Sequence, residues 1–457
     1  MEQRDLIVIG AGPGGYVAAL RAAQLGMSVA LIDKQPFLGG TCLNVGCIPS
    51  KTLLFATEQL AWIQQHGASW GIQGSVQADI TTMMERKTEV VSGFRQGIHS
   101  LCQRAKIHVI EAAAELQGGN RVRLSTGEEL QGRWILLAAG SEPIVLPSIP
   151  VDEETIVTST GALSLKKVPK RLIVIGAGVI GVELGSVYQR LGSQVTFIEA
   201  TAGICPGLDG TIVKSFQALL EAQGLQFRLN QKVKSCQKRG DVVDVVLDSG
   251  EQLEADVVLV AIGRRPYTAG LGLDKAGVTP GPGGRLVVDG RFWTGVDGIY
   301  AIGDLIDGPM LAHKASEEAV VCVEGLAGLP SKIDYISVPN VIYTHPEVAT
   351  VGLTEEQARG FGLKVHVGTF PFKANSRARC CGEVGGLVKV IGEEGSDRLL
   401  GIHIVGAHAS ELIAVGVLAM QQGVRVAQLA HCCMAHPTLS EALKEAALDF
   451  AKSAIHK

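Results

Sequence analysis

The chain has 457 residues, of which 46% are apolar and 19% charged, and its formal net charge at pH 7 is −4. At about 150 residues per domain, this length predicts two to four domains. The small net charge gives no sign of nucleic acid or an anionic membrane as a partner, and no apolar run approaches the ~20 residues that span a bilayer. The first strand-like run begins at Leu6 and leaves no room for a signal peptide, so we expect a cytoplasmic protein.

Glycine and cysteine are the informative residue types. The 57 glycines exceed the average share of about 7% and indicate tight turns and close approach of the backbone to ligands. The ten cysteines show no zinc-ligand spacing, so we expect no metal site. Cys380–Cys381 and Cys432–Cys433 are neighbours, and we interpret both pairs as ordinary thiols because a bridge between adjacent residues is strained.

Residues 6–33 carry a dinucleotide-binding fingerprint. A buried-strand pattern leads into a GxGxxG motif, an apolar-periodic helix and a second strand that ends at an acid. Gly10 permits the turn, Gly12 lets the backbone approach a pyrophosphate, and Gly15 lets the helix pack on the strand. Asp33 stands where a carboxylate would accept hydrogen bonds from a ribose.

The same order recurs 166 residues further along the chain. Gly176, Gly178 and Gly181 repeat the three glycines, and Glu199 repeats the acid. Two fingerprints predict two dinucleotide sites, so a bound cofactor and an exchanging one form the natural pair. A duplicate that binds nothing is the alternative, which the two retained acids disfavour.

The rest of the chain divides at about residue 336. Before it, strands that end in glycine close each unit, and Asp304 follows one of them, at the end of a strand where ligands bind in open α/β sheets. After it, alternating runs predict an antiparallel sheet with no nucleotide motif, and we expect this unit to form an interface. The predicted strands cover 134–139, 256–262, 298–302, 338–343, 364–370, 387–391 and 399–405; small antiparallel meanders cover 107–124 and 233–247; and helices cover 79–104, 310–326, 410–422 and 438–452.

The stretch 39–51 carries two cysteines five positions apart. On a regular helix five residues rise ~7.5 Å, and a disulfide rarely tolerates Cα atoms more than about 7 Å apart. A bridge between Cys42 and Cys47 therefore needs a distorted turn, which Gly46 allows. In a cytosolic protein such a bridge is more often catalytic than structural. The alternative is a pair of buried, reduced cysteines that act as small apolar residues.

His436 is a further candidate for chemistry. It precedes a proline, which disfavours helical geometry, and Glu441 could orient its imidazole as a general base. Thr438-x-x-Glu441 is also a capping box, which would occupy the glutamate at a helix N-terminus. The segment alone leaves both interpretations open.

Together these motifs resemble the flavoprotein disulfide reductases and, within them, the dihydrolipoamide dehydrogenase family, over essentially the whole chain. The cysteine stretch is the most specific part, and the segments 178–185, 309–314, 343–347, 370–377 and 436–441 agree with it. The resemblance implies an α/β fold with two Rossmann-like domains, one for FAD and one for NAD, and a C-terminal α+β interface (dimerisation) domain. The expected limits are 1–147 and 267–335 for the two parts of the FAD-binding domain, 148–266 for the NAD-binding domain, and 336–457 for the interface domain.

The resemblance implies FAD, bound tightly but not covalently, on the first fingerprint and NAD on the second. The implied FAD contacts are Gly10, Gly12, Gly15, Asp33, Gly40, Thr41, Lys51, Ser141, Asp304 and Ala312. The implied NAD contacts are Gly176, Gly178, Val179, Ile180, Gly181, Glu199, Val233 and Gly263.

The resemblance also implies catalytic roles. Cys42 corresponds to the interchange thiol that reacts with lipoyl sulfur, and Cys47 to the flavin-side thiolate. Lys51 and Glu183 correspond to an ion pair near the reactive edge of the flavin. Since only a thiolate attacks a disulfide, a base must take the proton of the substrate thiol.

By resemblance that base is His436, paired with Glu441, which serves the active site of the partner subunit in a homodimer. The implied activity is oxidation of protein-bound dihydrolipoamide by NAD⁺. Lipoyl domains or other subunits of a 2-oxo acid dehydrogenase or glycine cleavage complex are the implied partners. Three residues depart from the family pattern, at Asp33, Ala139 and Met434, and none of them touches the thiols.

Two alternatives compete. One is an NAD(P)H-dependent reductase of another disulfide, disfavoured because Glu199 suits the ribose 2′-hydroxyl of NAD and repels the 2′-phosphate of NADP. The other is a non-catalytic, nucleotide-binding scaffold subunit, which would leave the combination of Cys42, Cys47, Lys51 and His436 unexplained.

Overall fold

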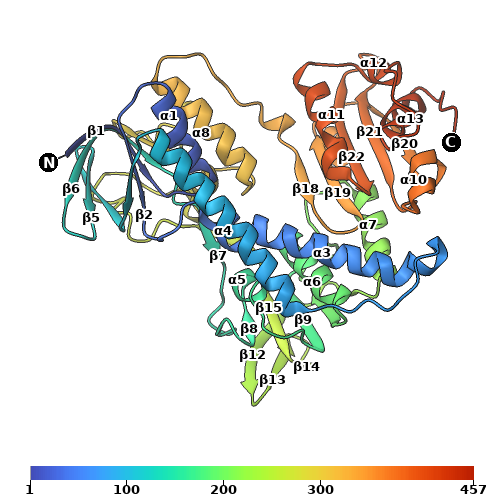
Figure 1. Cartoon of the computed structure of the whole chain (residues 1–457). Helices are drawn as coiled ribbons and strands as arrows, with labels where there is room; N and C mark the ends of the chain where they lie inside the picture. Colours follow the sequence, from blue (N-terminus) through green and yellow to red (C-terminus); the bar gives the residue numbers. More distant parts are fainter. Residues whose placement is uncertain (1) are drawn as a thin grey trace.

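The computed structural model describes residues 2–457, which fold around three large sheets, at the left, bottom and right of Figure 1. In the first sheet the parallel strands run in the order β3-β2-β1-β6, and β5 and β4 continue it antiparallel. The long β6 pairs with β1 throughout, with β5 at its start and with β17 at its end. The strands are β1 (Glu2–Ile9), β2 (Val29–Asp33), β3 (His108–Glu111), β4 (Ala114–Gly118), β5 (Arg121–Leu124), β6 (Glu129–Leu137) and β17 (Ile299–Ala301).

One expectation for this sheet is wrong. The stretch 107–124 does not form a single antiparallel meander, because its first strand, β3, pairs parallel with β2 at the edge of the sheet. Strand β3 is a short edge strand in which Val109 and Ile110 are half-buried and His108 and Glu111 are exposed. A run this short does not indicate whether the neighbouring strand is parallel or antiparallel. Helices α1 (Pro13–Gln24) and α8 (Ala312–Leu326) pack side by side on this unit (Figure 1).

The second sheet is wholly parallel, in the order β11-β10-β9-β15-β8. An antiparallel meander, β12-β13-β14, lies beside it as predicted for 233–247, and a two-strand link, β7-β16, joins it to the first unit. The strands are β7 (Ser141–Pro143), β8 (Ile156–Val157), β9 (Arg171–Ile175), β10 (Gln194–Ile198), β11 (Gln226–Arg228), β12 (Val233–Arg239), β13 (Val242–Leu247), β14 (Gln252–Ala255), β15 (Val257–Val260) and β16 (Arg264–Pro266); the helices are α5 (Ser159–Ala162), α6 (Val179–Arg190) and α7 (Gly210–Ala222).

The third sheet is antiparallel throughout, as predicted, in the order β18-β19-β22-β21-β20. Sequence analysis missed β19, which forms a hairpin with β18, although its Val-Ala-Thr-Val core was a signal. The elements are β18 (Asn340–Ile342), β19 (Glu347–Gly352), β20 (Val365–Pro371), β21 (Leu387–Glu393), β22 (Leu399–Gly406), α9 (Glu355–Gly360), α10 (Ser376–Cys381), α11 (Ala409–Gln421), α12 (Val426–Ala430) and α13 (Glu441–Phe450).

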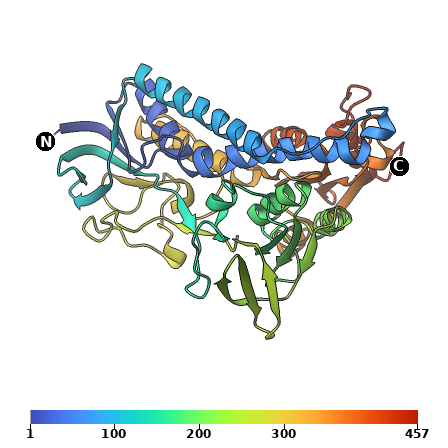
Figure 2. The same ribbon diagram turned by 60° about the horizontal axis from the view of Figure 1, so that its bottom comes forward.

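Two long helices connect the units. Helix α3 (Cys47–His66) packs against α4 (Ile80–Arg104) and α6, and Figure 2 shows α3 and α4 running lengthwise over the molecule. Helix α4 begins as predicted, because the Asp79 carboxylate accepts hydrogen bonds from the amides of Thr81 and Thr82. Because α3 packs against α6 of the second unit and follows the fingerprint of the first, its first turn, with Cys47, lies at the junction of these two units.

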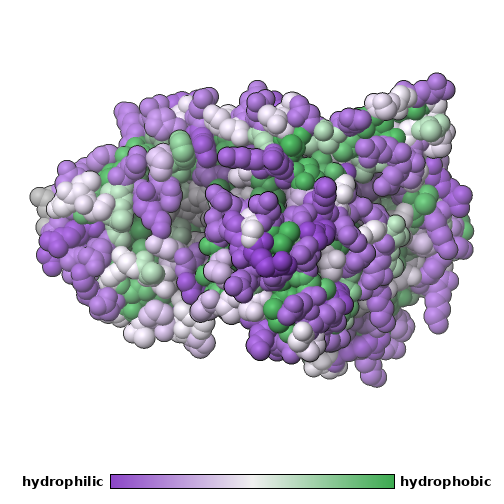
Figure 3. Space-filling view, turned by 90° about the horizontal axis from the view of Figure 1, so that it is seen from below, coloured by the Kyte–Doolittle hydropathy of each residue, from purple (hydrophilic) through white to green (hydrophobic). Residues whose placement is uncertain are grey.

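Each large sheet has its own apolar core. The run Leu6–Ile9 is buried on both faces, as its continuous apolar pattern predicts. The face seen in Figure 3 is mostly polar, with apolar side chains in separate patches. Among residues 2–457 no helix combines the length and the apolar character that crossing a bilayer demands.

Candidate active site

The two cysteines lie on either side of a break between helices. Helix α2 (Gly40–Val45) carries Cys42, α3 begins at Cys47, and Gly46 between them has φ −144° and ψ −113°. A Cβ at Gly46 would lie 2.8 Å from the Thr41 carbonyl oxygen and 3.2 Å from the Cys42 Cα. The distorted turn that a bridge requires is therefore present, and only glycine fits it. Both cysteines are free and half-buried.

The two thiols differ electrostatically. The hydrogen bond from Cys42 and the charge of Lys51 outweigh burial and lower the pKa of Cys47 to about 7. The pKa of Cys42 is raised by the same hydrogen bond and by burial. Since the thiolate is the reactive form, Cys47 is the sulfur better able to hold negative charge.

Lys51 lies one turn into α3 and pairs with Glu183 of α6. Its Nζ is 2.8 and 3.0 Å from the two carboxylate oxygens, and the Glu183 side chain is 4% exposed. The backbone N–H of Tyr343 donates to the same carboxylate at 2.9 Å, and the Tyr343 ring lies 4.7 Å from the ammonium. Sequence analysis missed Tyr343, although it opens a segment that carried the resemblance.

The cysteine-bearing helix packs directly on the first fingerprint. The Gly39 N–H donates to the Ala11 carbonyl at 2.8 Å. A Cβ at Gly40 would lie 2.5 Å from the Gly12 Cα, so the two backbones touch. Thr41 follows in the first turn of α2, beside that contact.

The fingerprint loops form cradles that only glycine permits. Gly10 has φ +102°, and a Cβ on Gly15 would collide with the Gly10 carbonyl. A Cβ on Gly12 would meet only the Gly40 Cα, at 3.9 Å. The first amides of α1 have no partner within the helix and can bind phosphate. The Asp33 carboxylate accepts from the Ala11 N–H at 2.7 Å and keeps lone pairs for a ribose. The residues therefore fit FAD.

Two further predicted FAD residues, Ser141 and Asp304, lie at neighbouring strand ends. The Ser141 hydroxyl donates to Asp304 at 2.5 Å, and Arg264, which sequence analysis missed, donates to the same hydroxyl at 2.8 Å. Gly303 is held by the buried Glu318, whose carboxylate accepts its N–H at 2.8 Å. Ala312 is the first residue of α8.

The second fingerprint has the same geometry and fits NAD. Gly176 has φ +96°, a Cβ on Gly181 would collide with the Gly176 carbonyl, and a Cβ on Gly178 would meet nothing within 4 Å. The Glu199 carboxylate accepts from the Ala177 N–H at 2.7 Å. The other predicted NAD residues lie where helices and strands begin or end: Val179 and Ile180 in the first turn of α6, Val233 at the start of β12, and Gly263, with φ +125°, after β15.

The His436 segment forms the contact with Glu441 but not the capping box: α13 begins at Glu441 with Ser440 as its N-cap, and the Thr438 hydroxyl donates to the Ala435 carbonyl oxygen. One Glu441 oxygen contacts the His436 Nδ1 at 2.9 Å, and the other accepts the Thr438 N–H at 2.9 Å. The glutamate therefore orients the imidazole and also holds the backbone of the turn before α13. No hydrogen bond or ion pair of residues 2–457 joins His436 to either cysteine of the same chain. Met434 packs against the apolar core of the third sheet.

Comparisons with known proteins agree with this geometry. A family profile described as pyridine nucleotide-disulphide oxidoreductase matches residues 4–319, and the dimerisation domain of the same family matches residues 338–447. A mitochondrial dihydrolipoyl dehydrogenase 2 of Arabidopsis thaliana is 47% identical over 465 residues, covering 100% of this chain and 92% of the relative. A leghemoglobin reductase of Glycine max is 47% identical over 457 residues, covering 98% and 87%.

Solved structures give the same result. The crystal structure of LpdA from Mycobacterium tuberculosis superposes with a TM-score of 0.91 at 28% identity, covering 98% of this chain and 99% of that one. In the part of the chain that the structure describes, no group of three or more His, Cys, Asp or Glu side chains could hold a metal ion. The chain belongs to the pyridine nucleotide-disulphide oxidoreductase family and, within it, to the dihydrolipoamide dehydrogenases.

Proposed function

We propose that the protein oxidises protein-bound dihydrolipoyl groups with NAD⁺, through the Cys42–Cys47 pair and bound FAD. The observation that carries this proposal is the helix break at Gly46, which brings two thiols of unequal pKa close together. These thiols lie beside the Lys51–Glu183 pair, and the helix that carries Cys42 packs on the glycine loop that fits FAD. Relatives named dihydrolipoyl dehydrogenase match the full length of the chain.

The chain's own groups account for the sulfur chemistry. His436 of the partner subunit takes the proton of one substrate thiol, and the resulting thiolate attacks Cys42 of the oxidised pair. The S–S bond breaks, and Cys47 leaves as a thiolate stabilised by the Lys51 ammonium. The second substrate thiol attacks the substrate sulfur of the mixed disulfide, the bond to Cys42 breaks and the lipoyl ring closes. The proton of this second thiol passes to the released Cys42 sulfur, whose pKa is raised. FAD, when bound, supplies the carrier that takes the two electrons on to NAD⁺.

The domain limits, 1–147 with 267–335, 148–266 and 336–457, are part of this proposal. They are supported because every strand of each large sheet falls within the corresponding limits. We further propose a homodimer, in keeping with the dimerisation-domain match, that works with lipoyl domains of a 2-oxo acid dehydrogenase or glycine cleavage complex. The cytoplasmic location stays a prediction, since the Arabidopsis relative is named as mitochondrial.

Stopped-flow reduction tests the proposal. Dihydrolipoamide should reduce the flavin of the wild-type protein rapidly, whereas Cys42→Ser should lose this reaction and keep its flavin. The control is His436→Gln, which should slow lipoyl turnover far more than NADH oxidation by an artificial acceptor. Reduction of Cys42→Ser at the wild-type rate would show that the thiol mechanism is wrong.

A further inference from the structure

Asn375 lies buried beside the segment that carries His436, and the mechanism above makes no use of it. Its side chain is the N-cap of α10, where Oδ1 accepts the Ala378 N–H at 2.9 Å. Its Nδ2 donates to the Thr438 carbonyl oxygen at 3.0 Å. Asn375 is only 3% exposed, so both contacts are shielded from water. One side chain thus ties α10 to the turn before α13.

Thr438 in turn holds the acid/base pair. Its N–H donates to one oxygen of Glu441, whose other oxygen contacts the His436 Nδ1. The His436 side chain is 68% exposed, and among residues 2–457 it makes no other hydrogen bond. Its orientation therefore depends on Glu441, and the position of Glu441 depends on Thr438.

We infer that Asn375 is a positioning residue for proton transfer: by holding the Thr438 carbonyl it keeps Glu441 on the Nδ1 side of His436. A carboxylate that accepts from Nδ1 leaves Nε2 as the basic nitrogen of the neutral ring. The inference rests on the proposed function, in which this nitrogen takes the proton of the substrate thiol.

The two contacts of Asn375 can be separated by substitution. Aspartate and serine cap helices as well as asparagine does, so Asn375→Asp and Asn375→Ser should both keep α10. Neither can donate an amide N–H to the Thr438 carbonyl. Asn375→Ser introduces no charge, so it serves where a buried carboxylate would disturb folding.

Both variants should keep flavin absorbance and the wild-type rate of NADH oxidation by an artificial acceptor. Turnover of dihydrolipoamide should fall about tenfold, a part of the ~10²–10⁴ that acid–base catalysis contributes. The loss should fall on kcat, with the KM for dihydrolipoamide unchanged, because Asn375 acts through His436 and Glu441. An unchanged kcat, or a loss confined to KM, would overturn the inference.

Thr354→Ala is the matched control. Thr354 is the buried N-cap of α9, which is a six-residue helix of the same domain, like α10. Its side chain accepts the Gln357 N–H, within its own helix, and so does not hold the His436 segment. The substitution should cost about 1 kcal/mol of stability and leave the kcat for dihydrolipoamide unchanged. If the wild-type protein does not oxidise dihydrolipoamide, the proposed function fails. The inference is then decided by the NMR signal of the His436 Nδ1–H group, which Asn375→Ser must change at a fixed pH and Thr354→Ala must leave unchanged.

Discussion

The two fingerprint units share one hydrogen-bonded frame and differ in what the chain does next. In both, the acid at the end of the second strand accepts an amide of the glycine loop, and a later residue donates back to that loop. The matched pairs, 166 residues apart, are Ala11 to Asp33 and Ala177 to Glu199, Gly10 to Ile32 and Gly176 to Ile198, and Gly39 to Ala11 and Cys205 to Ala177. Both loops are therefore built alike.

After the last of these bonds the units diverge. In the first, the chain continues as α2, and Gly40 packs on Gly12. In the second, the chain runs from Cys205 to Asp209, and Gly178 keeps open space around it. The first loop is covered by the cysteine helix and the second is not. This is the difference expected between a cofactor that stays bound and one that exchanges at every turnover.

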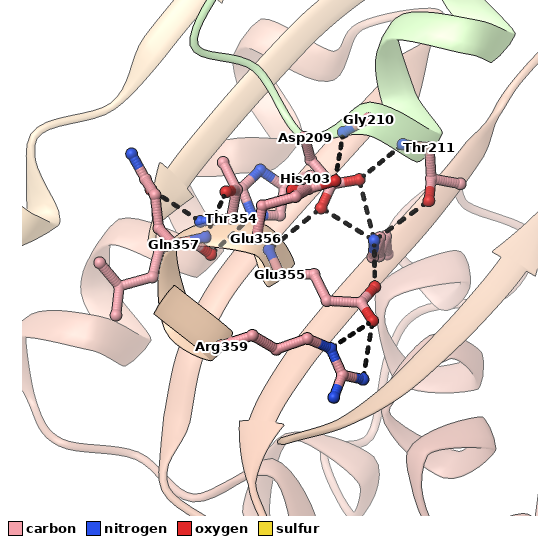
Figure 4. Close-up of polar contacts among 11 residues, drawn as sticks. Asp209, Gly210, Thr211, Thr354, Glu355, Glu356, Gln357, Arg359 and His403 are labelled. Carbon is pink, nitrogen blue, oxygen red and sulfur yellow. Dashed lines mark hydrogen bonds and ion pairs between the residues drawn. The ribbon is translucent and has the colours of Figure 1, made fainter. Parts of the chain in front are cut away.

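In the second unit, where no helix covers the glycine loop, Asp209 anchors the chain that follows the loop. The Asp209 carboxylate, the Thr211 hydroxyl and Glu355 all accept hydrogen bonds from the ammonium of Lys389, a residue of the third sheet. Figure 4 labels the three partners, Asp209, Thr211 and Glu355. The Lys389 side chain is 2% exposed and that of Asp209 is fully buried. The chain after the NAD fingerprint is thus anchored to the interface sheet instead of to its own glycine loop.

The largest effect should come from Gly40→Ala. The added methyl group would lie 2.5 Å from the Gly12 Cα, and residue 40 has φ +55°, so strain falls on both the cysteine helix and the FAD loop. We expect protein that lacks flavin, measured by its visible absorbance after purification. Gly178→Ala is the control. Its added methyl group meets no protein atom within 4 Å, so the variant should keep flavin. The methyl group would lie where the backbone approaches the pyrophosphate, so the KM for NAD⁺ should rise about tenfold, about 1.4 kcal/mol. Equal flavin content in the two variants would contradict the conclusion that α2 covers the first glycine loop and that the second loop is uncovered.

A smaller effect is expected from Lys389→Met, which leaves Asp209 buried without its cation. Removing one partner of a buried pair costs about 3–5 kcal/mol, so thermal unfolding should begin several degrees lower while flavin stays bound. Lys457→Met is the control, since it breaks the partly exposed pair with Asp449 and should cost about 1 kcal/mol or less. Similar losses of stability in the two variants would show that the buried Lys389–Asp209 pair contributes no more than the partly exposed Lys457–Asp449 pair.

The difference in stability between the wild type and Lys389→Met should depend on pH because the Asp209 carboxylate titrates. Burial alone would raise the pKa of Asp209, but the hydrogen bond and charge of Lys389 lower it below its usual value of 3.8. The stabilisation is therefore present at neutral pH and is lost as the pH falls below 3.8. The gap between wild type and Lys389→Met, measured by unfolding at several pH values, should narrow in acid.

Local signals predicted the parts of the molecule that local chemistry determines. Continuous apolar runs marked the buried strands, the GxGxxG spacing marked both loops, and the reach of a disulfide predicted the break at Gly46. The Lys51–Glu183 pair, 132 residues apart, came only from family resemblance. The Lys389–Asp209 pair, 180 residues apart, was missed because an ion pair between distant segments has no period or spacing. The parallel pairing of β3 was missed for a similar reason: a run this short does not indicate whether the neighbouring strand is parallel or antiparallel.

The smallest effects should come from neutralising Asp33 and Glu199. These changes test whether FAD is retained mainly by α2, which covers the first glycine loop, or by the Asp33 carboxylate. Glu199→Gln removes the charge that repels a 2′-phosphate, so the preference for NAD⁺ over NADP⁺, measured as a ratio of kcat/KM values, should fall about tenfold, about 1.4 kcal/mol. Asp33→Asn makes the same change in the first unit, and its side-chain oxygen can still accept the Ala11 N–H. Because α2 covers the first loop, the variant should retain flavin through dialysis. Loss of flavin from Asp33→Asn would mean that the acid, and not the cysteine helix, holds the cofactor in place.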